Sequence, residues 1–188
     1  KLKEEDAVFL PADFDYYSDM SSKAMEIIEK YADVFEYVGR DEAYLDVTKK
    51  TEIDFHNAEH LAQQLKNEIR NSLKLTCSVG ITPNKLLSKI ASDYKKPDGL
   101  TTVKPEQVEE FLSPLKIREI PGIGKKTENV FMQMNVHTIE ELRKIDVFDL
   151  NKIFGRKTGG YIFNSAKGID TEIVKERPPT IQFSKIIT

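Results

Sequence analysis

The stretch VGRDEAYLDVT, residues 38–48, combines a turn, two adjacent acids and an alternating run. After Asp41 and Glu42, apolar side chains recur at every second position, namely Ala43, Leu45 and Val47. A period of two is typical of a strand that is covered on one face. The preceding VFEYV, residues 34–38, predicts a partner strand. We therefore expect a β-hairpin over 34–48 with both acids at or near its turn.

The rest of the first hundred residues predicts further helices and strands around this hairpin. Apolar spacing and capping residues predict helices over 16–31, 57–72 and 83–93, and strands over 75–81 and 100–103. This order is typical of an α+β layer, an antiparallel sheet with helices on one face. Beyond residue 104 only short helices are predicted, one of them opened by a capping box from Thr138 to Glu141.

Composition and charge narrow the class of protein. With 188 residues, 39% of them hydrophobic and 31% charged, the chain is typical of one or two globular domains. No apolar run is long enough for a membrane span, and KLKEED at the start is no targeting segment, so we expect a cytoplasmic protein without membrane contact. Cys77 lies in the apolar run LTCSVGI and is expected to be a buried structural thiol. Residues 1–70 carry a net charge of −8 and residues 71–188 one of +5, which only weakly favours a polyanionic partner for the second part.

The acidic pair Asp41 and Glu42 is the first candidate site. Two acids in a turn are most often simply solvated. Here, however, lysines follow in and just after the predicted helix over 83–93, namely Lys85, Lys89, Lys95 and Lys96. Carboxylates hold Mg²⁺ and ammonium groups hold phosphates, so the combination indicates a metal and phosphate site.

A second candidate lies in IREIPGIGKKTENVFMQMNVHTIEELRKI, residues 117–145. A short helix, a Pro-Gly-apolar-Gly turn and a lysine-rich helix start are typical of a helix-hairpin-helix. Its glycines, Gly122 and Gly124 around Ile123, allow a phosphate to approach the backbone, and Lys125 and Lys126 add positive charge. The plain alternative is an ordinary helical turn.

Three other motifs are better interpreted as structural features than as functional sites. PADFDYY, residues 11–17, holds two aspartates but leads into helical spacing, so it is interpreted as a helix cap. HNAEH, residues 56–60, has the spacing of a zinc motif but begins an amphipathic helix without a convincing third ligand. GIGKKT, residues 122–127, lacks the first glycine and the hydroxyl residue of a phosphate-binding P-loop.

Together, three segments resemble the Y-family DNA polymerases, the translesion enzymes of the DNA polymerase IV type. They are GRDEAYLDVT (39–48), TCSVGITPNKLLSKIASDYKKPDGL (76–100) and EIPGIGKKT (119–127). The resemblance implies template-directed, low-fidelity DNA synthesis across damaged DNA, by nucleotidyl transfer from a dNTP to a primer 3′-OH with two Mg²⁺ ions. It also implies a ferredoxin-like palm, a helical thumb that grips DNA and a little finger domain.

The resemblance assigns roles to individual residues. Asp41 matches the carboxylate that bridges both metals, and Glu42 the metal ligand nearest the primer 3′-OH. Lys96 matches the lysine on the incoming triphosphate, and the turn 122–126 matches the DNA-binding turn of the thumb. The family usually has Ser-Ile before the acids where this chain has Gly39-Arg40, a departure that bears on the local electrostatics.

The same resemblance predicts the domain organisation. Residues 1–103 are expected to form a palm that lacks its first strand, which carries another aspartate, and the fingers insertion. Residues 104–173 are expected to form the helical thumb, and 174–188 a linker and the start of the little finger. A chain that begins late in the palm is expected to be inactive alone.

The expected partners are primer-template DNA and dNTP, with a sliding clamp as a further candidate, and the protein is expected to be a monomer. Two other functions stay open on the sequence. A nucleotide cyclase also carries Gly-x-Asp-Glu on a palm hairpin, but that hypothesis leaves residues 117–145 unexplained. A non-enzymatic helix-hairpin-helix DNA-binding protein would leave the two acids as surface residues.

Overall fold

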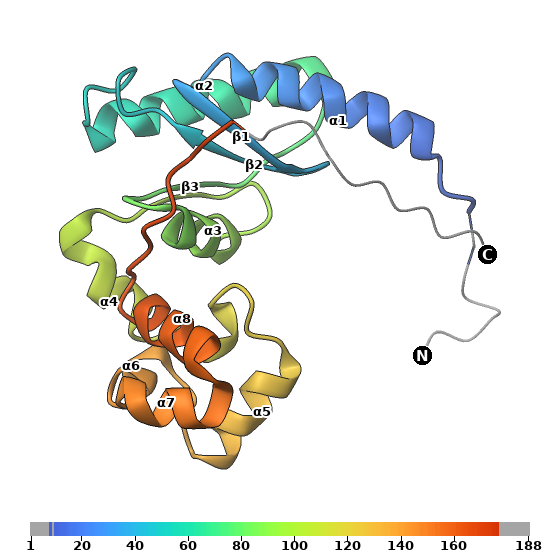
Figure 1. Cartoon of the computed structure of the whole chain (residues 1–188). Helices are drawn as coiled ribbons and strands as arrows, with labels where there is room; N and C mark the ends of the chain where they lie inside the picture. The colour runs from blue at the N-terminus through green and yellow to red at the C-terminus, as the bar shows by residue number, and fades with distance from the viewer. Residues whose placement is uncertain (1–7, 9, 177–188) are drawn as a thin grey trace.

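The computed structural model describes residue 8 and residues 10–176, which form two lobes joined along one side (Figure 1). The upper lobe holds the hairpin and three helices, and the lower lobe is entirely helical. In the part of the chain that is described, no helix is long and apolar enough to cross a membrane.

The upper lobe follows the predicted order of elements. Its helices and strands are α1 (Phe14–Glu29), β1 (Val34–Gly39), β2 (Glu42–Asp46), α2 (Phe55–Leu73), β3 (Val79–Ile81), α3 (Lys85–Tyr94) and β4 (Leu100–Thr102). The side chains of Asp13, Asp54 and Asn84 each accept a backbone N–H at the start of α1, α2 and α3. The capping role predicted for the PADFDYY motif is therefore confirmed.

The strands form two separate two-stranded sheets, and this detail differs from the expected antiparallel sheet. β1 and β2 pair antiparallel, with Phe35 opposite Leu45 and an irregularity between Tyr37 and Gly39. β3 and β4 are parallel, because helix α3 carries the chain back between them. The α+β class of the fold is as predicted, but its two sheets stand on either side of a cleft.

The lower lobe packs short helices around a buried centre. Its elements are η2 (Pro105–Gln107), α4 (Val108–Leu112), η3 (Ile117–Glu119), α5 (Lys125–Gln133), α6 (Ile139–Arg143), α7 (Val147–Phe154) and α8 (Arg156–Ala166). The predicted capping box is present, since Thr138 and Glu141 each accept the other's backbone N–H.

The main hydrophobic core crosses from one lobe to the other. Leu86, Leu87 and Ile90 of α3 belong to the same buried cluster as Phe131 and Ile162 of the lower lobe. A smaller cluster, formed by Ile27, Leu65 and Ile69, lies where α1 and α2 pack together. Helix α3 therefore contributes to the lower lobe's core although it belongs to the upper lobe in sequence.

After α8 the chain returns to the upper lobe, and we call this segment, residues 168–176, the strap (Figure 1). Two bonds attach its start to α3. Asn84 Nδ2 donates to the carbonyl oxygen of Gly168 at 2.9 Å, and the Leu86 N–H donates to Asp170 Oδ2 at 3.0 Å. Of the predicted linker and little finger start, residues 174–188, those from 177 on lie outside the described residues.

Candidate active site

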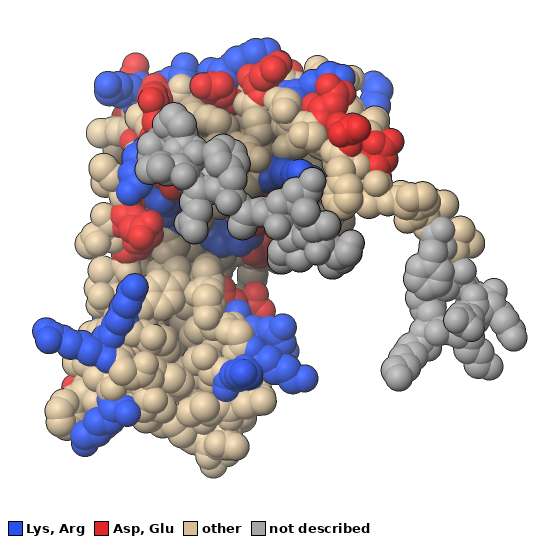
Figure 2. Space-filling view, turned by 45° about the vertical axis from the view of Figure 1, so that its right-hand side comes forward, with Lys and Arg blue, Asp and Glu red and all other residues tan. Residues whose placement is uncertain are grey.

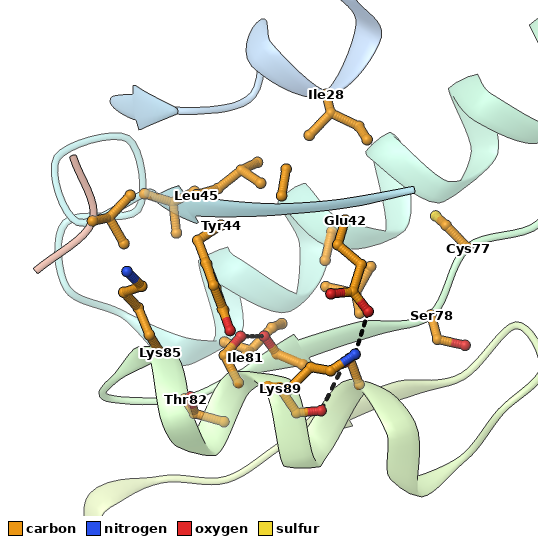
Figure 3. Close-up of a pocket in the computed structure, with 18 of the residues that line it drawn as sticks. Ile28, Glu42, Tyr44, Leu45, Cys77, Ser78, Ile81, Thr82, Lys85 and Lys89 are labelled. Carbon is orange, nitrogen blue, oxygen red and sulfur yellow. Dashed lines mark hydrogen bonds and ion pairs between the residues drawn. The ribbon is translucent and has the colours of Figure 1, made fainter. Parts of the chain in front are cut away.

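A cleft of about 790 Å³ lies between the hairpin and the β3–α3 unit (Figure 3). Asp41 and Glu42 line it from the hairpin, and Lys89 and Lys96 line it from α3 and the following turn. Apolar side chains of α2, such as Leu61, line it as well. The fold therefore gathers the predicted carboxylates and the predicted phosphate-binding lysine around one cavity.

The turn of the hairpin presents the two acids differently. Asp41 is exposed, and among the described residues its side chain has no hydrogen bond or ion pair. Glu42 is partly covered, and its Oε1 forms an ion pair with Lys89 Nζ. Arg40, which departs from the family pattern, does not line the cleft. Its guanidinium lies over the Phe14 ring of α1, 6.0 Å from the ring centre.

Lys89 and Lys96 share an acidic partner on α3. Asp93 lies 3.3 Å from Lys89 through Oδ2 and 2.6 Å from Lys96 through Oδ1. Burial lowers the pKa of Lys89, but its bond to Glu42 and the charge of Asp93 outweigh this and raise it overall. Burial raises the pKa of Asp93, but the two lysines hold it below its ordinary value. The sequence reasoning noted Lys89 only as one of several cations, and it missed Asp93.

A buried ion pair joins the hairpin to α3. Lys85 Nζ bonds to Glu36 Oε1 at 3.0 Å and Oε2 at 2.9 Å, and both residues are less than a tenth exposed. Glu172 of the strap also reaches Lys85 Nζ, at 3.3 Å. The same ammonium lies 5.0 Å from the centre of the Tyr44 ring. Sequence reasoning missed this pair, because its members are far apart in the chain and nothing in the sequence says which lysine Glu36 will face.

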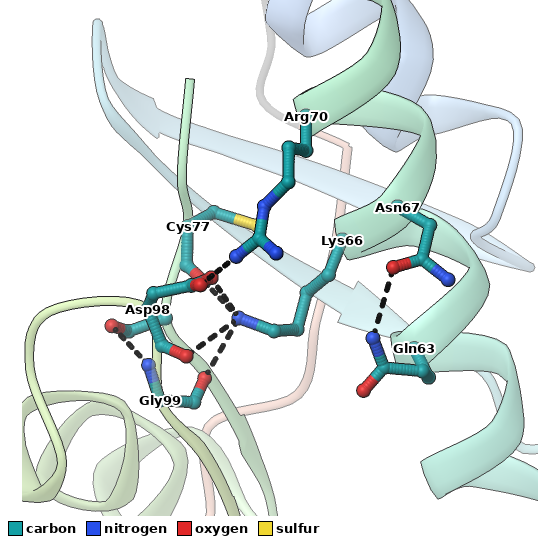
Figure 4. Close-up of polar contacts among 8 residues, drawn as sticks. Gln63, Lys66, Asn67, Arg70, Cys77, Asp98 and Gly99 are labelled. Atoms are coloured by element: carbon teal, nitrogen blue, oxygen red, sulfur yellow. Dashed lines mark hydrogen bonds and ion pairs between the residues drawn. The ribbon is translucent and has the colours of Figure 1, made fainter. Parts of the chain in front are cut away.

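The turn that carries Lys96 is held from behind by α2 (Figure 4). Lys66 is buried, and its Nζ donates to Asp98 Oδ1 at 2.6 Å and to the carbonyl oxygens of Cys77, Asp98 and Gly99. Arg70 binds the other carboxylate oxygen of Asp98. The network ties the ends of β3 and β4 to α2, and it stabilises the turn next to Lys96.

These contacts explain two differences from the sequence expectations. The carbonyl of Cys77 bonds to Lys66 rather than to a strand, so β3 begins only at Val79 instead of residue 75. Cys77 is also only partly buried, because its side chain lines the cleft. Its surroundings still raise the pKa of the thiol through burial.

The glycine turn of the lower lobe is shaped by its neighbours. Gly122 has φ +82°, which only glycine adopts at low cost, and Ile123 is buried in the main core. The Tyr161 hydroxyl donates to the carbonyl oxygen of Pro121 at 2.6 Å. Gly124 caps α5 without any side-chain bond, which leaves the first N–H groups of the helix available to an anion.

Two basic side chains lie at the start of α5. Lys125 and Lys126 follow the cap directly and are exposed. Figure 2 shows several Lys and Arg side chains that project from the lower lobe, whereas basic and acidic side chains are mixed at the top of the upper lobe. The geometry of this turn fits the predicted helix-hairpin-helix.

The donors of the cleft fit a divalent cation of the Mg²⁺ type. Mg²⁺ prefers carboxylate oxygens and commonly takes one or two from the protein, leaving its other positions to water and phosphate. Asp41 and Glu42 supply that number. Over residue 8 and residues 10–176, no group of three or more His, Cys, Asp and Glu side chains is placed to hold a metal.

This fold and this cleft are typical of the palm and thumb domains of a DNA polymerase. Residues 1–93 match the model of the impB/mucB/samB family, and residues 118–170 match that of the DNA polymerase-iota thumb domain. A DNA polymerase IV of Nitrosopumilus maritimus is 68% identical over 189 residues, which cover the whole chain and 52% of that relative. DNA polymerase IV 1 of Methanosarcina mazei is 42% identical, with 53% of its length covered.

Solved structures agree with these relatives. DinB from Sulfolobus solfataricus superposes with a TM-score of 0.85 and 36% identity, over 90% of this chain and 50% of that one. The insertion ternary complex of Dbh DNA polymerase gives a TM-score of 0.84 at 36% identity, over 90% and 49%. The chain belongs to the Y family of DNA polymerases. It spans about half the length of the relatives that it matches.

Proposed function

We propose that this chain supplies part of the palm and the thumb of a template-directed DNA polymerase that bypasses damaged DNA with low fidelity. One observation carries the proposal: the fold brings Asp41 and Glu42 of the hairpin to the same cleft as Lys96, which lies more than fifty residues later. Carboxylates and a lysine in one cavity are the groups that a metal-bound dNTP requires.

Within this proposal each residue has a separate task. Asp41 and Glu42 would hold Mg²⁺, and the bound ion would neutralise charge on the triphosphate and lower the pKa of the primer 3′-OH. Lys96 contacts the triphosphate, and the exposed half of its side chain allows this. The turn 122–126 binds the phosphate backbone of primer-template DNA through backbone N–H groups and lysines, without regard to sequence.

The shape of the cleft also supports a palm that is completed by another strand. Among the described residues, β2 pairs only with β1 and β3 pairs only with β4, yet both β2 and β3 line the cleft. Their remaining edges offer N–H and C=O groups to an added strand. A strand placed between them would join both sheets, and the resemblance expects one further palm strand that carries an additional aspartate.

The test uses Asp41→Ala in the full-length protein, with Asp19→Ala as the matched control. Asp19 lies on α1, is more than half exposed and does not line the cleft. We expect Asp41→Ala to lower primer extension by several orders of magnitude and to leave DNA binding nearly unchanged, whereas Asp19→Ala changes neither. The 188-residue chain alone is expected to give no extension.

Two outcomes would contradict the proposal. If Asp41→Ala lost extension and DNA binding together with its thermal stability, the acid would have a folding role. If the wild-type protein bound DNA in a salt-dependent way but neither extended primers nor responded to Mg²⁺, it would be a DNA-binding protein without polymerase activity. A cyclase finds no support in the matches above, all of which are to DNA polymerases.

A further inference from the structure

We propose that Lys89 occupies Glu42 until a divalent cation arrives and then shifts toward Asp93, so that loading of the metal site loosens Lys96 for the triphosphate. This inference rests on the proposed function. Lys89 and Asp93 are positioning residues in it, since they act through Glu42 and Lys96. Neither role follows from the motifs that led to the acidic pair.

The four side chains form a row of alternating charge, and all of them except Asp93 line the cleft. Glu42 pairs with Lys89, Lys89 with Asp93, and Asp93 with Lys96. Figure 3 shows the Lys89 ammonium pointing at the Glu42 carboxylate across the cleft. Lys89 and Asp93, the two inner residues, each have two partners of opposite charge. A change at Glu42 therefore alters how strongly Asp93 holds Lys96.

A cation at Glu42 competes directly with Lys89. The cation and the Lys89 ammonium both bind the Glu42 carboxylate, and two positive charges at one carboxylate repel each other. Asp93 offers Lys89 a second acceptor on the same helix, one turn away, at 3.3 Å. Asp93 already contacts both lysines, and once Lys89 leaves Glu42 and moves closer it takes a larger share of the Asp93 carboxylate, which then holds Lys96 less strongly.

The exposure of these groups makes the exchange feasible. The side chains of Lys89, Glu42, Asp93 and Lys96 are 27%, 43%, 35% and 56% exposed. Partly exposed ion pairs contribute little, because water replaces each partner at small cost. The buried pair of Lys85 and Glu36 next to them cannot exchange in this way, so it fixes the hairpin against α3 while the row rearranges.

The first test measures Mn²⁺ binding to the full-length protein by electron paramagnetic resonance, without nucleotide or DNA. Lys89→Met should tighten Mn²⁺ binding about two- to fivefold, the factor that corresponds to a partly exposed ion pair. Lys89→Arg keeps the competitor and should match wild type. Lys95→Met removes the same charge from the neighbouring turn, outside the cleft lining, and should also match wild type.

The outcomes separate this inference from the proposed function. If Glu42→Gln did not weaken Mn²⁺ binding, the proposed metal site itself would be wrong. If Glu42→Gln weakened binding but Lys89→Met left it unchanged or weaker, only the competition would be refuted. Equal tightening in Lys89→Met and Lys95→Met would mean a general charge effect and would also overturn the inference.

The second test follows the lysine side chains themselves. In ¹⁵N-lysine NMR spectra of the full-length protein, Mg²⁺ should shift the Nζ signals of Lys89 and Lys96 but not that of Lys85. Asp93→Asn removes the charge that links Lys89 to Lys96. In this variant the Lys96 signal should no longer respond to Mg²⁺, while that of Lys89 still shifts. A Lys96 signal that ignores Mg²⁺ in the wild type, or responds equally in Asp93→Asn, would refute the coupling.

Discussion

The buried pair between Glu36 and Lys85 allows a sharp prediction, because the same lysine also has an exposed partner. Glu36→Gln keeps the shape of the side chain but removes the charge that faces Lys85 at 2.9 Å. The side chains of the two residues are only 6% and 10% exposed, so the ammonium is left in a site that water hardly reaches. Its remaining acidic partner, Glu172, is 75% exposed and compensates little.

The expected loss of stability follows from this burial. Removing one partner of a buried pair typically costs roughly 3–5 kcal/mol of unfolding free energy. In a protein of this size, roughly 2–4 °C of melting temperature corresponds to each kcal/mol, so the melting temperature should fall by about 6–20 °C. Glu172→Gln removes an exposed partner of the same ammonium and should cost at most about 1 kcal/mol.

The assay is thermal unfolding of wild type and both variants by calorimetry at neutral pH and again at alkaline pH. Burial lowers the pKa of Lys85, but Glu36 and Glu172 outweigh it and raise the pKa above its ordinary value of 10.5. The stability from a raised pKa is complete below 10.5 and is lost as the pH rises through the folded-state value. The deficit of Glu36→Gln should therefore be largest below pH 10.5 and shrink above it. Equal losses in the two variants would refute the reasoning.

Three further predictions concern other parts of the molecule. Burial, followed by the bond to Glu68, raises the pKa of Tyr31 to about 12. The stability from this bond should therefore be complete below pH 10 and lost towards pH 12. Ultraviolet titration of Glu68→Gln should show that the Tyr31 phenolate forms at a lower pH than in wild type. Lys66→Met in the full-length protein should lower the melting temperature, because the bond to Asp98 is lost and the turn beside Lys96 loosens. For the same reason it should raise the KM for dNTP more than it lowers kcat. Lys66→Arg should restore part of the melting temperature and part of the KM. Tyr161→Phe should weaken DNA binding about two- to fivefold without changing its salt dependence, since a hydrogen bond to the glycine turn is lost but no phosphate contact is. Lys125→Gln, by contrast, should reduce the slope of binding against salt by about 1, and binding titrations at several salt concentrations distinguish the two.

Local features of the chain were predictable because their causes act within a few residues. A side-chain oxygen three residues before a free N–H determines where a helix starts, as at Asp13, Asp54 and Thr138. Alternating side chains and a short turn predict the hairpin and place the two acids at its bend. The glycine turn at 122–124 follows from the same short-range rules, and Gly122 has the positive φ that such a turn requires.

The amino-acid sequence therefore determined the elements of this protein, the α+β class and the segments that carry its resemblance. Only the tertiary structure decided which side chains meet. Lys89 reaches Glu42, Lys85 reaches Glu36 and Lys66 reaches Asp98 across 47, 49 and 32 residues. It also decided that β3 and β4 run parallel and that α3 shares its core with the lower lobe. Such pairings depend on how whole helices pack, and the charge or apolarity of one residue does not say which distant partner it will face.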